Sequence, residues 1–333
     1  MNDILNRSLC KTYANFFPIG AAVCPDIIKT HSELLKKHFN SLTCENHMKP
    51  ALIHPEEKKW QFEEADAIVD FATANKMKVR GHTLVWHKQV PDWMFIDSKG
   101  NEVGRDLLLA RMKEHITVMM ERYKKQVYCW DVVNEAIEDK GPEAYRQSRW
   151  YKIIGPDFVD KAFEFARKVD PEAKLFYNDY NCTSPEKSKK IYNIAKRLKD
   201  NGRLIDGIGM QGHWNIYNPS FDRIMDTIDL YSSLGLKIQI TELDISMFLF
   251  DDETKEFKQP TDEMIWLQQE RFEGIFKIFR DYRDIITGVT FWGVADDYTW
   301  LDDFPVKGRK DWPLLFDTQH KPKKAFAGVV NFE

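Results

Sequence analysis

Eight short apolar runs, each followed by a segment with helical periodicity, constrain the fold of this chain more than any other feature. The runs are residues 19–23, 40–45, 79–86, 127–134, 175–180, 205–212, 236–242 and 288–293. Strands that alternate with helices predict a parallel sheet. Eight such units favour a single closed (β/α)8 barrel, the α/β TIM-barrel class, over an open doubly wound sheet. No GxGxxG stretch follows the first run, which argues against a dinucleotide-binding version of the open sheet.

The segments between the runs carry helix signals. Residues 57–75 and 106–124 each place apolar side chains on one face, with charges opposite. Pro185 suits the first turn of a helix over residues 185–200, with Ser184 as its N-cap. A polar stretch, residues 248–264, follows the seventh run and is too long for a tight connection. We expect it to be a loop on the active face of the barrel.

Size, composition and net charge favour a single globular domain that binds neither nucleic acid nor an anionic membrane. A chain of 333 residues with 43% hydrophobic and 30% charged residues has ample material for a core, and α/β barrels reach this length as one domain. We therefore expect residues 1–333 to form one catalytic barrel domain. The net charge of −4 gives no electrostatic reason to expect nucleic acid or an anionic membrane as a partner.

The cysteines and the N-terminal segment predict a cytoplasmic protein. The five cysteines are widely spaced and form no CxxC pair, so we expect free thiols and a reducing compartment. The first 17 residues contain no apolar stretch with a small-residue cleavage site, which predicts the absence of a signal peptide. No stretch approaches the ~20 apolar residues that a membrane span needs.

Two glutamates stand where apolar runs end. Asn134 and Glu135 follow the fourth run, and Glu242 closes the seventh run, with Asp244 two residues later. The carboxyl ends of the strands of a barrel face the active site, so polar residues there are typical of chemistry. Two carboxyl groups at such positions predict an acid/base or an acid/nucleophile pair.

The other strand ends add polar and aromatic residues to the same mouth. Amides, acids and histidines supply donors and acceptors for hydroxyl groups, and tryptophan rings suit the C–H faces of a sugar. The predicted pocket therefore resembles a saccharide site. Its further members are Glu45, Asn46, Lys49, His82, Trp86, His87, Gln89, Asn178, Asp179, Tyr180, Gln211, His213 and Trp292.

Seven motifs in one order give a closer resemblance. They are TCENHMKP, GHTLVWHKQ, WDVVNEA, FYNDYN, GMQGHW, ITELD and FWGVADD. From about residue 18 to Phe326 the chain resembles the family 10 glycoside hydrolases, the retaining endo-β-1,4-xylanases, and in particular their intracellular bacterial members. The resemblance implies a (β/α)8 barrel with Glu135 as general acid/base and Glu242 as nucleophile. It implies no cofactor and no metal. The chain has no residues left for a carbohydrate-binding module, which points to imported xylo-oligosaccharides as the substrate.

The resemblance also implies roles for the neighbours of the two glutamates. Asn134 would hold the sugar 2-hydroxyl, and His213, oriented by Asp244, would keep Glu242 ionised. The other implied substrate contacts are Lys49, His82, Trp86, Gln211 and Trp292 at the cleavage point, Glu45, Asn46 and Trp300 at the next sugar, Asn178 and Tyr180 on the leaving-group side, and Gln89.

Several further expectations can be tested against the structure. A second carboxylate across the site predicts that Glu135 is protonated in the free enzyme. Lys49, as a buried charge, would need a carboxylate partner, and Glu45 is a candidate. We expect Asp131 to point away from Glu135 and to tie loops together. We expect Asp296 and Asp297 to be a solvated or loop-capping pair.

Three other functions compete with this hypothesis. A metal hydrolase is disfavoured because the sequence has no HxH or HExxH pair. A non-catalytic sugar-binding barrel would not need both Glu135 and Glu242. A retaining glycanase acting on cellulose or mannan would share both glutamates. Xylose has no hydroxymethyl group at C5, so we expect a bulky side chain such as Trp292 to close that side of the site.

Overall fold

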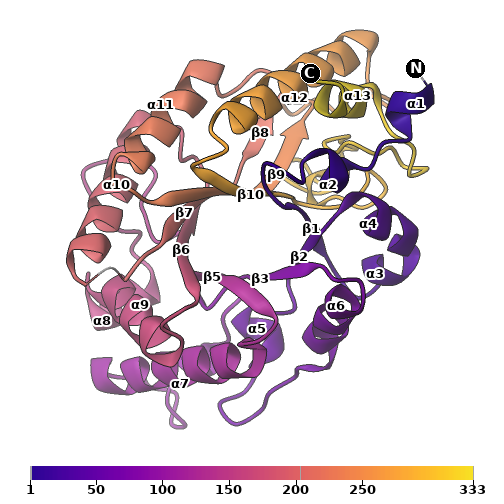
Figure 1. The fold of residues 1–333 in the computed structure, drawn as a ribbon. Helices are drawn as coiled ribbons and strands as arrows, with labels where there is room; N and C mark the ends of the chain where they lie inside the picture. Colours follow the sequence, from indigo (N-terminus) through magenta and orange to yellow (C-terminus); the bar gives the residue numbers. More distant parts are fainter. Residues whose placement is uncertain (1, 203, 333) are drawn as a thin grey trace.

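The computed structural model describes residues 2–202 and 204–332. Eight parallel strands form a closed ring with the helices outside it (Figure 1). The ring closes because β10 pairs with β1, through Val289 and Ile19, and also with β9, through Ile286 and Ile238. The strands in ring order are β1 (Ile19–Val23), β2 (Ser41–Cys44), β3 (Lys78–Gly81), β5 (Val127–Asn134), β6 (Lys174–Asp179), β7 (Gly207–Met210), β9 (Lys237–Ser246) and β10 (Ile286–Phe291).

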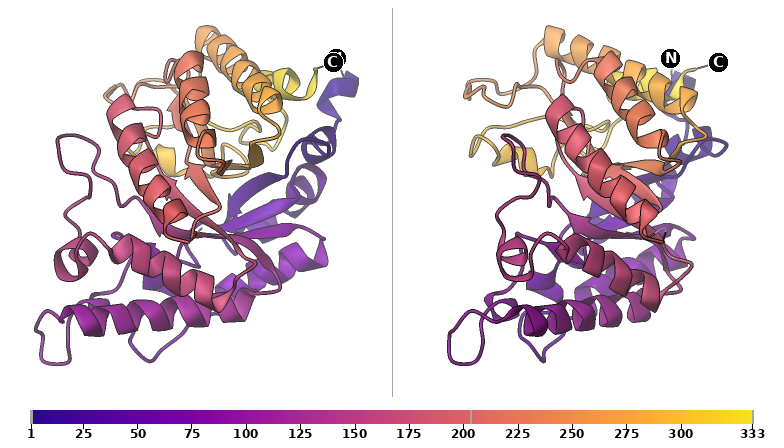
Figure 2. Two further views of the ribbon diagram at one scale, coloured as in Figure 1. Left: turned by 60° about the vertical axis from the view of Figure 1, so that its left-hand side comes forward. Right: turned by 90° about the vertical axis from the view of Figure 1, so that its left-hand side faces the viewer.

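Two short strands and a layer of helices complete the barrel. β4 (Val85–Trp86) pairs with β5, and β8 (His213–Asn215) pairs with β9. The side views show helices packed against the outside of the sheet (Figure 2). The helices are α1 (Asn2–Leu5), α2 (Leu9–Thr12), α3 (Ile27–Thr30), α4 (Ser32–His38), α5 (Pro50–Ile53), α6 (Glu63–Ala74), η1 (Asp92–Met94), α7 (Arg105–Tyr123), α8 (Arg149–Ile154), α9 (Phe158–Val169), α10 (Pro185–Asp200), α11 (Phe221–Ser232), α12 (Asp262–Asp281), η2 (Trp300–Asp302) and α13 (Lys324–Val330).

The predicted barrel is confirmed, and the strands differ from the apolar runs in two places. The third run is divided between β3 and β4. The seventh run was expected to end at Glu242, but β9 continues to Ser246 because it also pairs with β8. The helix predicted over residues 57–75 begins only at Glu63.

Side-chain caps fix the starts of three of the helices. Ser148, Ser220 and Thr261 stand at the N-caps of α8, α11 and α12, and each accepts a hydrogen bond from a backbone N–H in the first turn. Such a bond satisfies one of the donors that a helix start leaves unpaired. Ser184 occupies the predicted N-cap position of α10, yet its side chain makes no capping bond.

A charged layer lies inside the barrel beneath the site. Arg80 of β3 and Asp131 of β5 are both fully buried and form a two-pronged ion pair, and Arg80 Nε also donates to Gln239 of β9 at 2.9 Å. Burial lowers and the charge of Asp131 raises the pKa of Arg80, and the net shift is upward. Asp131 was expected to tie loops together; instead it pairs inside the barrel with Arg80 and with His82, at 2.9 Å.

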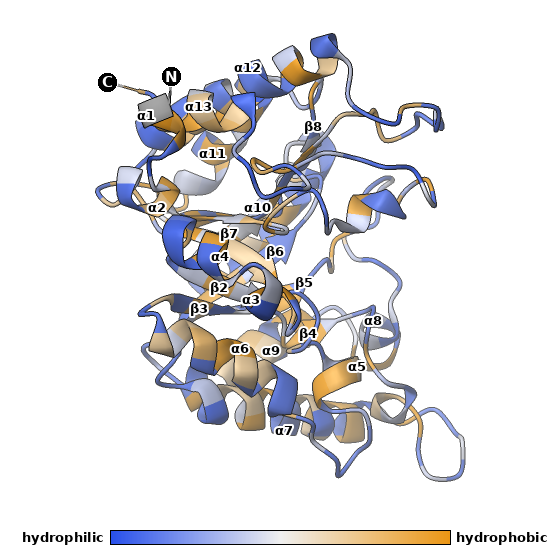
Figure 3. Ribbon diagram, turned by 90° about the vertical axis from the view of Figure 1, so that its right-hand side faces the viewer, coloured by the Kyte–Doolittle hydropathy of each residue, from blue (hydrophilic) through white to orange (hydrophobic). Residues whose placement is uncertain are grey.

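The first and last parts of the barrel are joined to each other. Tyr13 donates to the Val329 carbonyl at 2.7 Å, and Arg7 donates to the Val330 carbonyl at 2.9 Å. The first and last helices, α1 and α13, lie side by side (Figures 1 and 2). Figure 3 shows apolar residues on the strands and inner helix faces, while the loops at one end are largely hydrophilic. Within the described residues, no helix combines the length and the apolar composition that crossing a bilayer requires.

The Arg80–Asp131 pair generates a prediction about stability. Replacing Asp131 by Asn leaves the Arg80 guanidinium buried without its counter-charge, which costs about 3–5 kcal/mol of unfolding free energy. Chemical denaturation monitored by tryptophan fluorescence measures the difference. The control is Glu33→Gln, which breaks the exposed pair with Lys36 and should change stability by less than about 0.5 kcal/mol. An Asp131→Asn loss as small as that of the control would contradict the prediction.

Candidate active site

Both predicted glutamates lie toward the carboxyl ends of strands of the same barrel. Glu135 directly follows β5, and Glu242 lies within β9 rather than at its end. Both are at least nine-tenths buried. Because all the strands are parallel, the other predicted residues converge on the same end. Glu45 follows β2, His82 follows β3, Trp86 lies in β4, Asn178 in β6, Gln211 follows β7, His213 lies in β8 and Trp292 follows β10.

The Glu135 carboxyl group receives a donor at each oxygen. Trp86 Nε1 donates to Oε2 at 2.9 Å, and Gln211 Nε2 donates to Oε1 at 3.1 Å. The backbone of Glu135 has a φ of 55°, in the left-handed region that side-chain-bearing residues rarely adopt. Its N–H donates to the Asn178 carbonyl at 2.9 Å, which helps to hold this conformation. Strain of this kind is typical of functional positions.

Glu242 is held by an amide and an imidazole. Asn178 Nδ2 donates to Oε1 at 2.7 Å, and His213 Nε2 lies 3.2 Å from Oε2. The other ring nitrogen of His213 lies 2.9 Å from Asp244 Oδ2, an oxygen that also accepts from Trp300 Nε1 at 2.8 Å. The predicted contacts of His213 with Glu242 and Asp244 are therefore present in the structure.

This arrangement keeps Glu242 ionised. Burial alone would raise the pKa of Glu242, but the hydrogen bond from His213 and the charges of His82, His213 and Lys49 lower it to about 2. Burial alone would lower the pKa of His213, but the charges and hydrogen bonds of Asp244 and Glu242 raise it to about 10. A carboxylate and an imidazolium therefore face each other near neutral pH, and Glu242 stays a charged nucleophile.

A chain of amides connects the two carboxyl groups. Asn134 Oδ1 accepts from Asn178 Nδ2 at 2.9 Å and from Gln211 Nε2 at 3.3 Å. Gln211 also donates to Glu135, and Asn178 also donates to Glu242. The positions of the two glutamates are thus coupled through three side chains from three different strand ends.

Lys49 was expected to pair with Glu45, and this expectation is wrong. Lys49 Nζ donates to Asn46 Oδ1 at 3.0 Å and lies 4.8 Å from the ring centre of Trp86. Burial lowers the pKa of Lys49, and the charges of Glu242, Glu45 and Glu135 offset only part of this effect. A buried ammonium group with an amide acceptor and an aromatic wall remains suited to binding a hydroxyl group.

Further predicted residues surround the glutamates. Glu45 Oε2 accepts from Tyr298 at 3.0 Å, and Gln89 Nε2 donates to Asn46 Oδ1 at 3.1 Å. The Trp292 ring packs edge-on against the rings of His82 and His213. Trp292 is thereby linked to Glu242, because His213 itself contacts that carboxyl group.

Two residues expected to contact substrate are used in another way. Asn178 is fully buried, and its amide group is occupied by Glu242, Asn134 and Thr241, so it positions the nucleophile rather than lining the leaving-group side. The hydroxyl of Tyr180 is bonded to Asp139 and accepts from Arg146 at 2.7 Å. Strand alternation predicts which face a side chain takes but not how deep in the barrel it lies.

Sequence reasoning missed Tyr177, which supports the turn of Glu135. Its hydroxyl accepts from the N–H groups of Ala136 and Ile137 at 3.0 and 3.2 Å and donates to Asp179 at 2.5 Å. A tyrosine within an apolar run is read as a core residue, so no sequence pattern indicates this role. Asp296 was expected to be solvated or to cap a loop. It is fully buried and pairs with Lys323 at 2.8 Å, and it accepts from the backbone N–H of Leu314 at 2.8 Å, which fits the loop-capping alternative.

Comparison with known proteins finds relatives that match nearly the whole chain. The profile described as "Glycosyl hydrolase family 10" matches residues 8–332. The chain is 55% identical over 326 residues to an endo-1,4-beta-xylanase of Geobacillus stearothermophilus, covering 97% of this chain and 98% of that protein. It is 52% identical to a crystal structure of xylanase XynB from Paenibacillus barcinonensis in complex with a conduramine derivative, with a TM-score of 0.96 and coverage of 97% and 98%. The structure of a mutant protein in complex with xylotriose is 50% identical with a TM-score of 0.96, covering 98% of this chain and 99% of that one.

The coupled groups Glu242 and His213 generate a prediction about pH and stability. The lowered pKa of Glu242 contributes stability above its ordinary value of 4.5, and this is lost as the pH falls through about 2. The raised pKa of His213 contributes stability below its ordinary value of 6.5, and this is lost as the pH rises through about 10. The pair therefore stabilises the protein most between these two ordinary values.

Replacing His213 by Asn should remove a few kcal/mol of unfolding free energy near pH 5.5, and less near pH 3 and pH 9. Denaturation of both proteins at the three pH values measures this difference, in which the titration of all other groups cancels. A difference that does not change with pH would contradict the assignment of the charges.

Proposed function

The chain belongs to glycosyl hydrolase family 10, and from this premise we propose that it is an endo-1,4-β-xylanase that cleaves β-1,4-linked xylose chains with retention of configuration. The observation that carries the proposal is a pair of buried carboxyl groups, Glu135 directly after β5 and Glu242 within β9. An imidazolium keeps Glu242 ionised. Retaining glycosidases use one protonated and one ionised carboxyl group.

In the first step, the Glu242 carboxylate attacks the anomeric carbon and the glycosidic C–O bond breaks. Glu135 gives its proton to the departing oxygen, and a covalent glycosyl–enzyme ester remains. In the second step, Glu135 takes a proton from water, the water oxygen attacks the anomeric carbon, and Glu242 leaves as a carboxylate. Two inversions restore the original configuration, and both glutamates return to their starting states.

The environments of the glutamates suit these two roles. His213 and Lys49 favour the charged form of Glu242, so it attacks as an anion. When Glu242 has become an ester, Glu135 acts as the base that takes a proton from water. A positioned acid or base contributes about 10²- to 10⁴-fold to the rate.

The surrounding residues bind the sugars. Asn134 lies beside Asn178 and Gln211, which contact the two glutamates, and its side-chain amide group binds the sugar 2-hydroxyl. Lys49, His82 and Gln211 contact the sugar at the cleavage point, with Trp86 and Trp292 against its faces. Glu45, Asn46, Gln89 and Trp300 bind on the non-reducing side, whereas Asn178 and Tyr180 act through their neighbours.

Xylose as the substrate rests on the relatives and on Trp292. The relatives described above are named xylanases, and one similar structure holds xylotriose. Trp292 is only 8% exposed and packs against two histidines, so it fills space that a hydroxymethyl group would need. Short xylo-oligosaccharides in the cytoplasm are the proposed substrate, and all five cysteines are free thiols, as a reducing compartment favours.

Separate removal of the two glutamates tests the mechanism. With a dinitrophenyl β-xylobioside, whose leaving group needs no acid, Glu135→Ala should release a rapid burst of phenolate and then turn over slowly. Azide should restore turnover and give the β-azide, because a small anion can enter the space of the lost base. On xylotetraose the same variant should lose about 10²- to 10⁴-fold in kcat/KM.

Glu242→Ala should show no burst, because the step that forms the ester needs this nucleophile. Glu33→Gln, which changes an exposed glutamate of α4, is the control and should retain full activity. A burst with azide rescue in Glu242→Ala, and none in Glu135→Ala, would reverse the two roles. Full activity of both variants would overturn the proposed function.

A further inference from the structure

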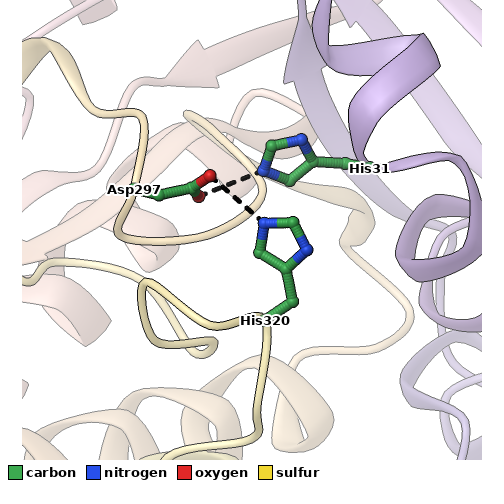
Figure 4. Close-up of side chains that lie close together, drawn as sticks. All are labelled: His31, Asp297 and His320. Carbon is green, nitrogen blue, oxygen red and sulfur yellow. Dashed lines mark hydrogen bonds and ion pairs between the residues drawn. The ribbon is translucent and has the colours of Figure 1, made fainter.

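A second group of ionisable side chains, His31, Asp297 and His320, lies outside the carboxylate pair (Figure 4). His31 Nε2 lies 3.0 Å from one oxygen of Asp297, and His320 Nε2 lies 3.2 Å from the other. One ligand atom from each of the three residues lies within 4.8 Å of the others. Asp297 was expected to belong to a solvated or loop-capping pair; in the structure two imidazoles approach it from two separate segments of the chain.

Thr30 provides a partner for the ring nitrogen of His31 that faces away from Asp297. Thr30 Oγ1 donates to the Asp26 carbonyl at 3.0 Å, and the same oxygen lies 2.8 Å from His31 Nδ1. When Nε2 of a neutral His31 binds a cation, Nδ1 carries the ring proton and donates it to Thr30 Oγ1. The position of Thr30 therefore suits a metal ion bound at His31 Nε2.

We propose that His31, Asp297 and His320 bind a divalent transition-metal ion of the zinc type. Imidazole ligands favour Zn²⁺ and its neighbours in the series over Mg²⁺ and Ca²⁺, which prefer oxygen ligands. Neighbouring ligand atoms of a tetrahedral zinc site lie about 3.3 Å apart, since each is about 2.0–2.2 Å from the ion. The two histidine–aspartate contacts, at 3.0 and 3.2 Å, are already close to this spacing.

The three side chains differ in burial, so the cluster is anchored in the protein and also reachable from solvent. The side chain of His31 is 3% exposed, while those of Asp297 and His320 are 33% and 34% exposed. A hollow of about 420 Å³ opens beside the two histidines, so an ion can enter and a water molecule can take the fourth position. The bond from His31 Nδ1 to Thr30 is the kind of outer contact that orients a histidine ligand.

The ion would join three segments around the closure of the barrel. His31 lies between α3 and α4, Asp297 follows β10, and His320 precedes α13. The segment after β10 also carries Tyr298, which donates to Glu45, and Trp300, which donates to Asp244. The ion therefore stabilises the mouth of the site without taking part in bond cleavage, and the proposal does not depend on the proposed function.

Metal titration of untagged, chelator-treated protein tests the site. We expect Zn²⁺ to bind saturably at one ion per chain by calorimetry and to raise the thermal unfolding midpoint, while Mg²⁺ and Ca²⁺ do neither. His320→Asn and Asp297→Asn should bind Zn²⁺ at least about 10-fold more weakly, since loss of even an outer partner of a ligand typically costs that much. His47→Asn, which changes a histidine paired with Glu64, is the control and should bind as the unchanged protein does.

A matched pair of substitutions tests the contact of Thr30 with His31. Thr30→Val removes the acceptor of His31 Nδ1–H at nearly constant shape and should weaken Zn²⁺ binding about 10- to 100-fold. Thr30→Ser keeps the hydroxyl group and should retain the affinity. Absence of one-to-one binding, or equal binding by His320→Asn and the unchanged protein, would overturn the proposal and leave the cluster as a hydrogen-bonded contact only.

Discussion

Two carboxyl groups in one mouth must hold different charges for a glycosidic bond to be cleaved with retention. The interaction on which this depends is the contact of Glu242 with His213, whose other nitrogen lies against Asp244. Glu242 and Asp244 lie two residues apart on β9, so their side chains share a face, and the pairing of β8 with β9 brings His213 to both. The part of β9 beyond Glu242 therefore supports catalysis, because it carries Asp244 and pairs with the strand that holds His213.

The amides between the glutamates explain why the barrel strands must keep their register. Asn178 is fully buried and contacts Asn134, Glu242 and Thr241, so a shift of β6 against β9 would break the support of the nucleophile. Gly209 of β7 makes room for it, because a Cβ atom there would lie 2.2 Å from Asn178 Oδ1. Side chains locked in this way hold a site to the geometry that catalysis needs.

The sequence predicted what depends on local pattern and missed what depends on contacts between distant segments. The apolar runs predicted all eight strands. The change from apolar to polar residues where the fourth and seventh runs end predicted Glu135 and Glu242 as site residues, because the carboxyl ends of barrel strands meet at one end of the barrel. The contact partners of side chains were harder to predict from the sequence. Lys49 contacts Asn46 rather than Glu45, and Asp131 pairs with Arg80 inside the barrel. The cluster of His31 and His320 could not be predicted, since only the closure of the barrel brings their segments together.

Proton NMR of the purified protein acting on xylotetraose tests the central claim most directly, with cellotetraose as the comparison. The anomeric signals of the new reducing ends are recorded before mutarotation mixes them. The account predicts that the β-anomer of the xylo-oligosaccharide product appears first and that cellotetraose is cleaved far more slowly. An α-anomer appearing first would contradict the role of Glu242 as nucleophile, and faster cleavage of cellotetraose would contradict xylan as the substrate class.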